Sequence, residues 1–325
     1  MKTEHFDIKA RQCLSKSDLA AIRELASICN EHEGLKGRLK YYFRYFFEGR
    51  GSAVVPRKSF SGSYISTIPK LKLNWDMLCE RQADVTDDFL CFEESGQLVG
   101  YLALYGFGGS EIEISGMVHP LYRRSGVFSR LLAGASDECR RRGIKSLLFI
   151  CDRNSSSGVA FVKAHDTVFD HSENKMEMPG SAEPVELHSP IILRKTGVED
   201  FDLLAKLNAI CFNMSEEDTR SFFIKNNILT SDQLFISVLD GIDIGMLRLT
   251  KENDDILIYG FGIKPEYRGK GYGRITLSRA VNIALEQKPK RVALEVDCVN
   301  DTALSLYKSC GFKTTATYDY YRLPL

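Results

Sequence analysis

The sequence predicts an α/β (α+β) protein that consists of two similar domains in tandem. Apolar runs alternate with helical patterns along most of the chain, and a glycine-rich turn joins a strand to a helix near residue 270. A second copy of this pattern lies 145 residues earlier, and a repeat of that length is a whole domain rather than a solenoid unit. A chain of 325 residues is long for one domain and suits two.

The composition is that of an ordinary soluble protein. Hydrophobic residues make up 44% and charged residues 26%, and 43 Lys+Arg balance 43 Asp+Glu. The zero net charge favours neither nucleic acid nor an anionic membrane as a partner. No apolar run is long enough to span a membrane, and residues 1–7 lack the apolar core of a signal peptide. These features favour a cytoplasmic location.

Cysteine and histidine usage predicts no metal site. The nine cysteines show no Cys-x-x-Cys pairing, and the six histidines show no ligand spacing. In a cytosolic chain such cysteines are expected to be mostly reduced and buried as small apolar residues. An oligomer is compatible with the sequence, which carries no signal for one.

The first copy begins with a strand and a helix within residues 6–30, for which Ser17 or Asp18 is the expected N-cap. Residues 34–47 are basic and aromatic. This favours an amphipathic helix with a buried aromatic face over a contact with an anionic or aromatic substrate. Further strands are expected at 89–92, 98–105 and 112–118.

The repeat is clearest at the glycine turn, where Pro, Tyr, Arg and Gly recur at one offset. The residues that match over 145 positions are Pro120, Tyr122, Arg123 and Gly126 with Pro265, Tyr267, Arg268 and Gly271. The two copies predict an N-terminal domain over 1–180, a linker over 181–189 and a C-terminal domain over 190–325.

The second copy shows a complete series of elements. Ser215 and Asp218 form a loose capping box before one helix, and Asp240-Gly241 is a strong hairpin signal. Helices are expected at 199–211, 215–226, 275–285 and 301–309. Strands are expected at 191–194, 234–239, 244–250, 255–263, 291–297 and 312–323.

The turn between the strand 255–263 and the helix 275–285 is the best candidate for an anion site. Its glycines allow positive φ and close approach of a phosphate, and the helix N-terminus adds unpaired N–H donors. A pyrophosphate is therefore the expected ligand. The pattern Gly271-Tyr272-Gly273 does not fit a nucleoside-triphosphate P-loop. The candidate binding residues are Arg268, Gly269, Lys270, Gly271, Tyr272, Gly273 and Arg274.

Several motifs in order resemble the GNAT superfamily of acyl-CoA N-acyltransferases over about residues 190–325. They are Arg268-x-x-Gly271-x-Gly273, Leu294-Glu295-Val296, Asn300, Ala303, Tyr307 and Gly311-Phe312. The resemblance implies two GNAT-like domains, each a twisted, mixed, mostly antiparallel sheet flanked by helices, and acetyl-CoA as cosubstrate without a metal. It also implies that the strand at Phe261, Gly262 and Ile263 diverges from its neighbour, pairs with the pantetheine arm and offers an amide to the thioester carbonyl.

Tyr307 stands at the position of the family's frequent general acid, so the resemblance implies that it protonates the departing thiolate. A phenol can do so if it is held within hydrogen-bond reach. The alternative is a tyrosine that only packs against CoA. Asn300 is expected to cap the following helix, bind the pantetheine arm, or do both.

Glu295 is a candidate general base for the amine. Strand alternation places it on the face opposite Leu294 and Val296. Its spacing to Tyr307 resembles that of ribosomal-protein N-terminal acetyltransferases, in which the carboxylate is the base. A solvated strand carboxylate is the alternative, and the other candidate bases are Asp254, Asp255 and Tyr259.

The first copy lacks these groups. Phe149 and Phe161 stand where the second copy has Glu295 and Tyr307, and Phe128 stands at the last glycine of the loop. The expected role of the N-terminal domain is therefore a non-catalytic scaffold or substrate-shaping half.

The expected function is acetyl-CoA-dependent N-acetyl transfer to a primary amine of a small molecule or peptide, directly, in the C-terminal domain. One alternative is a non-catalytic acyl-CoA-binding regulatory module. Another is an aminoacyl transferase of the peptidoglycan-bridge type, which also uses tandem GNAT folds, although the loop favours CoA over a charged tRNA. The acceptor is expected at residues 214–225 and 314–321, where Tyr318, Tyr320 and Tyr321 either wall a pocket or pack as ordinary strand residues.

Overall fold

The computed structural model describes residues 6–32, 73, 75–79, 81, 84–106, 110–225, 228, 233–252 and 254–325. The basic aromatic segment 34–47 lies outside these residues. The chain divides into two compact units. Unit 1 comprises Met1–Ser172 with Ala316–Leu325, and unit 2 comprises Glu173–Thr315.

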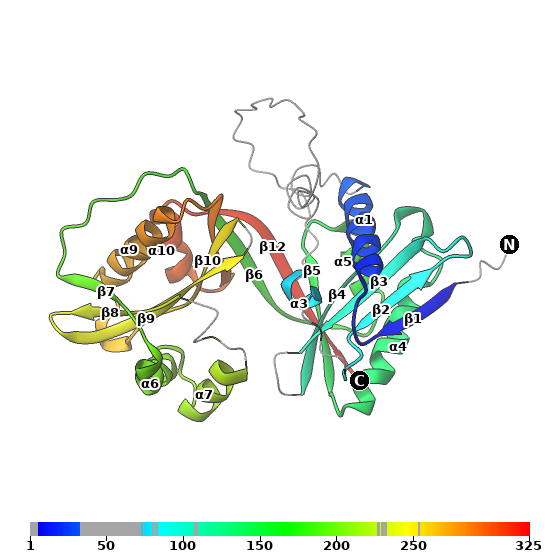
Figure 1. Ribbon diagram of the computed structural model, residues 1–325, viewed down its shortest axis with the longest axis horizontal. Coiled ribbons are helices and arrows are strands. Elements are labelled where there is room, and N and C mark those ends of the chain that lie inside the picture. The colour runs from blue at the N-terminus through cyan, green and yellow to red at the C-terminus, as the bar shows by residue number, and fades with distance from the viewer. Residues whose placement is uncertain are drawn as a thin grey trace. The chain divides into compact units, whose positions relative to one another are not determined.

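Unit 1 is a mixed sheet with helices on both faces (Figure 1). Its strand order is β1-β2-β3-β4-β5-β12, and every pair is antiparallel except β4 with β5. The strands are β1 (Asp7–Arg11), β2 (Asp88–Phe92), β3 (Leu98–Tyr105), β4 (Glu111–Val118), β5 (Ser146–Asp152) and β12 (Lys313–Pro324). The helices are α1 (Lys16–His32), α3 (Trp75–Cys79), α4 (Val127–Arg141) and α5 (Ser156–Lys163).

Helix α1 begins two residues earlier than its sequence pattern suggests. Ser15 caps it, because the Asp18 N–H donates to Ser15 Oγ (3.0 Å) and the Ser15 N–H donates back to Asp18 Oδ2 (3.0 Å). The expectation that Ser17 or Asp18 is the N-cap is therefore wrong. Asp18 instead closes a capping box from inside the helix.

Unit 2 repeats the architecture with the strand order β6-β11-β10-β9-β8-β7, in which only β10 and β11 are parallel. The strands are β6 (Val168–Pro179), β7 (Ile191–Lys195), β8 (Gln233–Leu239), β9 (Ile242–Glu252), β10 (Asp255–Ile263) and β11 (Arg291–Asp297). The helices are α6 (Phe201–Phe212), α7 (Glu216–Lys225), α9 (Tyr272–Glu286) and α10 (Asp301–Ser309). The predicted fold class is confirmed.

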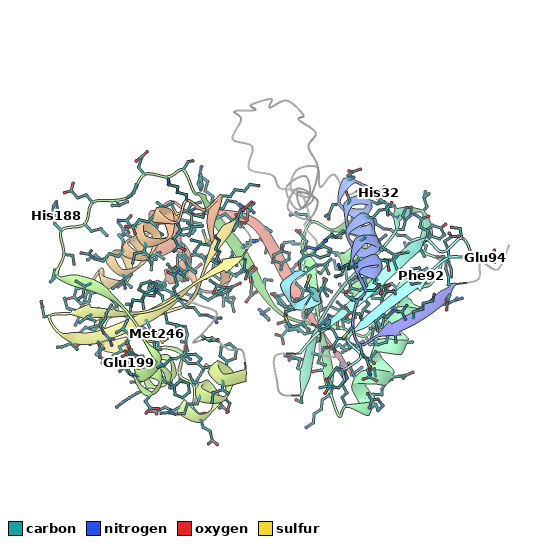
Figure 2. The ribbon with its side chains drawn as sticks, viewed as in Figure 1. His32, Phe92, Glu94, His188, Glu199 and Met246 are labelled. Carbon is teal, nitrogen blue, oxygen red and sulfur yellow. The ribbon has the colours of Figure 1, made fainter. Side chains whose placement is uncertain are left out.

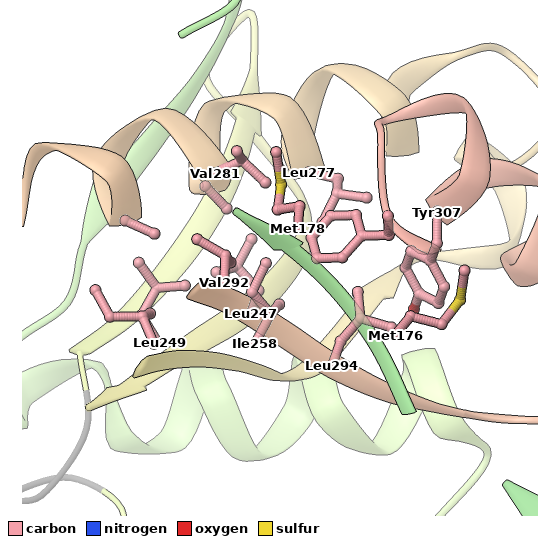
Figure 3. Close-up of a cluster of buried hydrophobic side chains, with 14 of the residues drawn as sticks. Met176, Met178, Leu247, Leu249, Ile258, Leu277, Val281, Val292, Leu294 and Tyr307 are labelled. Carbon is pink, nitrogen blue, oxygen red and sulfur yellow. The ribbon is translucent and has the colours of Figure 1, made fainter. Parts of the chain in front are cut away.

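Two hydrophobic layers hold the sheet of unit 2 between its helices. Met176, Leu247, Ile258 and Leu294 point toward α9 and α10, where Leu277 and Val281 meet them (Figure 3). On the other face, Met246 of β9 packs with buried residues of α6 (Figure 2).

The local signals of unit 2 form as predicted. Asp240 and Gly241 take positive φ values of 49° and 81° between paired strands, as a two-residue hairpin turn requires. Ser215 caps α7, because its Oγ accepts from the Asp218 N–H at 3.0 Å.

Each unit takes its last strand from the other copy of the sequence. The Glu173–Pro179 part of β6 pairs with β11 of unit 2, and the end of β12 pairs with β5 of unit 1. The sequence predicts one domain up to residue 180 and another from residue 190, each a continuous stretch of chain. The compact units instead divide inside β6 and inside β12. The side chains fit this exchange, since Met176 and Met178 are buried in the core of unit 2.

The exchange also places the C-terminal tyrosines. Tyr318 and Tyr320 are buried in unit 1 with Leu148 of β5, and His171 stacks on Tyr320. Of the two alternatives for Tyr318 and Tyr320, the structure supports ordinary strand packing, here in unit 1. These two tyrosines do not form an aromatic wall for an acceptor in the C-terminal domain.

A charged cluster fastens β12 to unit 1. Asp319 is 7% exposed and accepts hydrogen bonds from Arg153 Nη2 and from Ser172 Oγ, both at 2.6 Å. Burial opposes ionisation of Asp319, but the hydrogen bonds from Arg153 and Ser172 outweigh it and hold the pKa of the carboxyl below its usual range. A carboxyl of this kind stabilises the fold above its unfolded pKa, and the stabilisation is lost as the pH falls through its folded pKa.

We therefore expect Asp319→Asn to lower the free energy of unfolding by about 1–3 kcal/mol at pH 7. The difference in the free energy of unfolding between the wild type and Asp319→Asn should shrink below about pH 4, where the unfolded carboxyl is protonated. Urea unfolding at both pH values measures this. Asp137→Asn, which breaks an exposed pair with Arg140, is the control and should cost less than about 0.5 kcal/mol. Equal effects of the two substitutions would contradict the role of Asp319.

Candidate functional site

In both units the two parallel strands pair at their beginnings and then part. In unit 2, β10 and β11 pair from Asp255 with Arg291 to Leu257 with Ala293, although both strands continue. In unit 1, the pairing of β4 with β5 ends at Ile114 with Phe149. Beyond these points the facing strand edges have no partner in each other, so their backbone groups are open to a ligand. The expected divergence of the strand at Phe261 is confirmed.

A bulge bends β10 just after it leaves β11. The register between β9 and β10 shifts between Tyr259 and Gly262, and Gly260 has a φ of 54°. Gly262 is needed for close packing, since a Cβ there would lie 2.7 Å from the Cβ of Cys211 and 3.1 Å from the ring of Phe212. The end of α6 thus presses on the backbone of β10.

The loop after β10 has the geometry of an anion site. Gly269 and Gly271 take φ values of 74° and 81°, and Gly271 is the N-cap of α9 without a capping side chain. The first N–H groups of this 15-residue helix therefore point out of its N-terminus with no side-chain acceptor at the cap. The backbone is well placed for a pyrophosphate.

The basic side chains of the loop are engaged elsewhere. Arg268 donates from Nε to the Ile263 carbonyl (2.8 Å) and from Nη2 to the Cys211 carbonyl (2.7 Å). Lys270 Nζ donates to the Glu266 carbonyl (2.9 Å). Arg268 therefore fastens α6 to the end of β10, and Arg274 lies exposed at the start of α9.

Tyr307 lies beside the loop and the bent strand. Its ring centroid is 6.3 Å from that of Phe261, and a Cβ on Gly273 would be 3.8 Å from Phe261 and 3.5 Å from Leu306. Tyr307 is 8% exposed, and its hydroxyl has no hydrogen-bond partner among the described residues. Burial raises the pKa of Tyr307 to about 12, so the phenol stays protonated at neutral pH.

Glu295 lies on the other face of the sheet, as alternation predicts, because Leu294 and Val296 point into the core with Tyr307. The charge of Glu295 acts on the phenol of Tyr259. Burial, followed by the charges of Glu252 and Glu295, raises the pKa of the Tyr259 phenol far above its usual value. The structure therefore brings Tyr307 to the loop and Glu295 to Tyr259, on opposite faces of β11.

The group around Tyr259 contains two residues that the sequence reasoning missed. Tyr259 Oη donates to Glu252 Oε1 (3.2 Å), and the Arg248 guanidinium carbon is 4.9 Å from the centre of the Tyr259 ring. Both come from β9, where alternation from Arg248 to Glu252 marks one face. That pattern, together with the pairing of β9 and β10, could have found them.

The remaining candidate bases and Asn300 lie apart from this group. Asp255 pairs with Arg291 at the start of β10, and Asp254 lines a cavity of about 240 Å³ at the same end of the strand. Asn300 Oδ1 accepts from the Ala303 N–H (3.0 Å) and so caps α10.

Unit 1 carries the same backbone framework around a cavity of about 740 Å³. The cavity is lined by the parted ends of β4 and β5, the loop before α4, and α5. Arg124 and Gly126 have φ values of 68° and 81°, which match Gly269 and Gly271. Arg123 Nε donates to the Val118 carbonyl (3.2 Å), as Arg268 does to Ile263.

The model of the Acetyltransferase (GNAT) family matches residues 57–165 and 201–312. The chain belongs to this family. Membership makes it an acyltransferase with two family domains in tandem, as the repeat predicts.

Relatives with known names agree with this assignment. A candidate ribosomal protein bS18-alanine N-acetyltransferase of Bacillus subtilis is 31% identical over 123 residues, which cover 37% of this chain and 80% of that protein. The N-acetylaspartate synthetase of Rattus norvegicus is 28% identical over 92 residues, and the match covers 28% of this chain and 31% of that protein.

Two solved structures share the fold over nearly the whole chain. A GCN5-related N-acetyltransferase of Sphaerobacter thermophilus superposes with a TM-score of 0.71 at 16% identity, covering 98% of this chain and 95% of that one. A tandem GNAT protein from the clavulanic acid biosynthesis pathway superposes with a TM-score of 0.66 at 15% identity, covering 98% of each chain.

The two GNAT units differ at the parted strands. In unit 1, three ring centroids lie close to that of Phe161: those of Phe128 at 4.7 Å, Phe149 at 6.1 Å and His165 at 4.0 Å. Phe128 meets Phe161 edge-on. Phe128, Phe161 and His165 stand where unit 2 has Gly273, Tyr307 and Gly311. The expectation that Phe149 stands at the place of Glu295 is wrong, because Phe149 points into the core on the side of α4, as Leu294 does on the side of α9, and Ile150 takes the outward position. An aromatic ring therefore occupies the position of the candidate acid, and an aliphatic side chain that of the candidate base.

In the part of the chain that the structure describes, no group of three or more His, Cys, Asp or Glu side chains is placed to hold a metal ion. None of the helices in the described segments has the length and apolar character needed to cross a membrane.

Arg268 provides a test of the site's framework. Arg268→Lys keeps the charge but cannot reach the carbonyls of Ile263 and Cys211 together, so we expect the free energy of unfolding to fall by about 1–3 kcal/mol. Arg274→Lys, at an exposed position, is the matched control and should change it by less than about 0.5 kcal/mol. Urea unfolding measures both, and an unchanged Arg268→Lys protein would show that Arg268 does not fasten α6.

Proposed function

We propose that this GNAT protein is an acetyl-CoA-dependent N-acetyltransferase that transfers acetyl directly to a primary amine of a small molecule or peptide, with the chemistry in unit 2. The observation that carries the proposal is the meeting of three features in unit 2. They are the glycine loop, the unpaired edge of β10, and the buried phenol of Tyr307 beside Phe261. The named relatives are also N-acetyltransferases or an N-acetylaspartate synthetase.

Each feature has a part in holding the donor. The backbone N–H groups from Gly269 to Gly273 bind the diphosphate of CoA, since those of Arg268 and Arg274 donate to the Pro265 and Gly271 carbonyls. The open edge of β10 at Phe261, Gly262 and Ile263 pairs with the pantetheine arm and presents an amide to the thioester carbonyl. That amide stabilises the oxyanion as the amine attacks. Asn300 can contact the pantetheine arm from the cap of α10.

The proton steps follow from the two faces of β11. The amine approaches on the face of Glu295 and Tyr259, where a carboxylate accepts its proton directly or through water. On the other face, Tyr307 donates a hydrogen bond to the departing thiolate. Because the pKa of Tyr307 is about 12 and that of a free thiol is about 8.5, full transfer of the proton is uphill. The phenol therefore acts mainly by stabilising the thiolate until solvent protonates it.

Unit 1 takes no part in this chemistry. It keeps the loop and the cavity, but Ile150 and Phe161, at the places of Glu295 and Tyr307, can neither accept nor donate a proton. The non-catalytic binding role considered for the whole chain therefore suits unit 1, whereas unit 2 is the catalyst. Aminoacyl transfer remains the alternative activity, and turnover with acetyl-CoA as sole donor separates the two.

The donor site can be tested by calorimetry. Glutamate at position 271 places a negative charge and a strained positive φ in the loop, so Gly271→Glu should lose acetyl-CoA binding to unit 2 and all turnover. Gly241→Glu, with the same φ of 81° in the hairpin of β8 and β9, is the matched control and should keep both. Normal turnover by Gly271→Glu would remove the loop from the active site.

The role of the Tyr307 hydroxyl can be tested by kinetics. Tyr307→Phe keeps the packing against Phe261 and Phe312 but loses the hydroxyl, so kcat should fall at least about tenfold while the KM for acetyl-CoA changes little. Phe161→Tyr in unit 1 is the control and should leave turnover nearly unchanged. Thiol release from acetyl-CoA with a panel of primary amines and short peptides measures both. Wild-type kcat in Tyr307→Phe would remove Tyr307 from the mechanism.

A further inference from the structure

The cavity of unit 1 contains two buried polar atoms that have no hydrogen-bond partner in the described part of the chain. They are Asn30 Oδ1 and Ser115 Oγ, and both residues line the 740 Å³ cavity. Ser115 is only 3% exposed. A buried polar group without a partner costs about 1–3 kcal/mol, so native structures rarely keep one without a reason. Two of them in one cavity indicate a bound group that supplies the missing hydrogen bonds.

Both atoms lie where the strands of unit 1 part, on the side of α1. Ser115 directly follows Ile114, the last residue of β4 that pairs with β5. Met117, two residues further along β4, packs against α1, so Ser115 faces the same way. Asn30 is on α1 next to Cys29, whose Sγ donates to the Val118 carbonyl (3.4 Å).

This polar pair is arranged differently in unit 2. Ser115 pairs with Ala103 and Tyr259 pairs with Arg248, and Ala103 and Arg248 are 145 positions apart, so Tyr259 stands at the place of Ser115. The Tyr259 hydroxyl has a partner, since it donates to Glu252 Oε1 (3.2 Å). The end of α6 brings Cys211 and Phe212 against β10, and the ring of Phe212 covers Gly262. Among the described residues, unit 2 therefore has no hydroxyl without a hydrogen-bond partner at this point.

The cavity as a whole suits a long ligand with an anionic end and a neutral polar end. At one end are the loop with positive φ at Arg124 and Gly126 and the uncapped N-terminus of the 15-residue helix α4. The middle is walled by the rings of Phe128, Phe149 and Phe161. At the parting of the strands, Asn30 Oδ1 needs a donor, and the Ser115 hydroxyl can donate or accept.

We propose that unit 1 is a second, non-catalytic site that binds a CoA thioester whose acyl group carries a hydroxyl, and that Asn30 and Ser115 recognise this hydroxyl. The inference rests on the proposed function in taking a CoA ester as the ligand of the GNAT loop. An acetyl group has no donor for Asn30, so the two units select different esters. Phe161 in place of the candidate acid and Ile150 in place of the candidate base explain why the bound ester is not consumed.

The test uses the full chain with Gly271→Glu, which silences unit 2, and two esters that differ by one hydroxyl. In calorimetric titrations, 3-hydroxybutyryl-CoA should bind at least about tenfold more tightly than butyryl-CoA. A tenfold ratio of dissociation constants corresponds to the free energy that a buried hydrogen bond contributes. Ser115→Ala and Asn30→Ala should each reduce this preference to less than about threefold, with the affinity for butyryl-CoA unchanged. Equal affinities of the two esters, or a preference that survives both substitutions, would overturn the proposal.

Two controls separate recognition from structure. Thr250→Val removes another buried hydroxyl that has no partner in the described residues and lies on β9 of unit 2, so it should leave the preference intact. Ser115→Ala should leave the free energy of unfolding of the unliganded protein equal or higher, because it removes an unsatisfied group. A less stable Ser115→Ala protein would assign Ser115 a structural role instead.

The outcome also distinguishes this inference from the proposed function. If wild-type protein turns over acetyl-CoA but the Gly271→Glu protein binds neither ester, the second site is wrong and the function of unit 2 stands. If Gly271→Glu binds 3-hydroxybutyryl-CoA selectively and wild-type protein shows no turnover of acetyl-CoA, unit 1 keeps its site and the proposed function fails.

Discussion

Two parallel strands that pair over a few residues and then part are the constraint on which each unit depends. Beyond Leu257 the edge of β10 loses β11 as a partner, and unpaired backbone groups at such a site must find a ligand or water. The bend is held in place by contacts from elsewhere: Phe212 covers Gly262, and Arg268 joins the end of α6 to the end of β10. The bend brings Phe261 against Tyr307 and leads directly into the glycine loop.

The two copies keep this backbone constraint and differ in the side chains around it. The strongest sign is Arg124, a residue with a side chain in the left-handed region at a φ of 68°, where unit 2 has Gly269 at 74°. That conformation costs roughly 1–2 kcal/mol for a residue other than glycine. Unit 1 therefore retains the loop geometry at a cost, although it has lost the candidate acid and base. A unit that keeps the anion-binding loop but lacks the candidate acid and base is suited to bind a ligand without converting it.

Local patterns in the sequence were sufficient for much of the fold and for part of the site. The hairpin at Asp240-Gly241, the cap at Asn300 and the orientation of Glu295 each depend on residues a few positions apart. The exchange of β6 and β12 could not be predicted, since an alternating strand fits the edge of either copy equally well. The role of Arg268 was also hidden, because one of its acceptors, the Cys211 carbonyl, is 57 residues away in the chain. Asn30 and Ser115 meet only through the packing of α1 on β4.

The strand exchange has a consequence for how unit 1 folds. Its parted strand β5 forms one wall of the cavity, and the other edge of β5 pairs with Tyr318–Pro324 of β12, at the very end of the chain. Until those residues have been synthesised, this edge of β5 has no partner, and Arg153 lacks the carboxylate of Asp319. All residues of unit 2, in contrast, precede Ala316 in the chain. Unit 1 is therefore completed after unit 2, because the strand that closes the edge of β5 follows every residue of unit 2 in the chain.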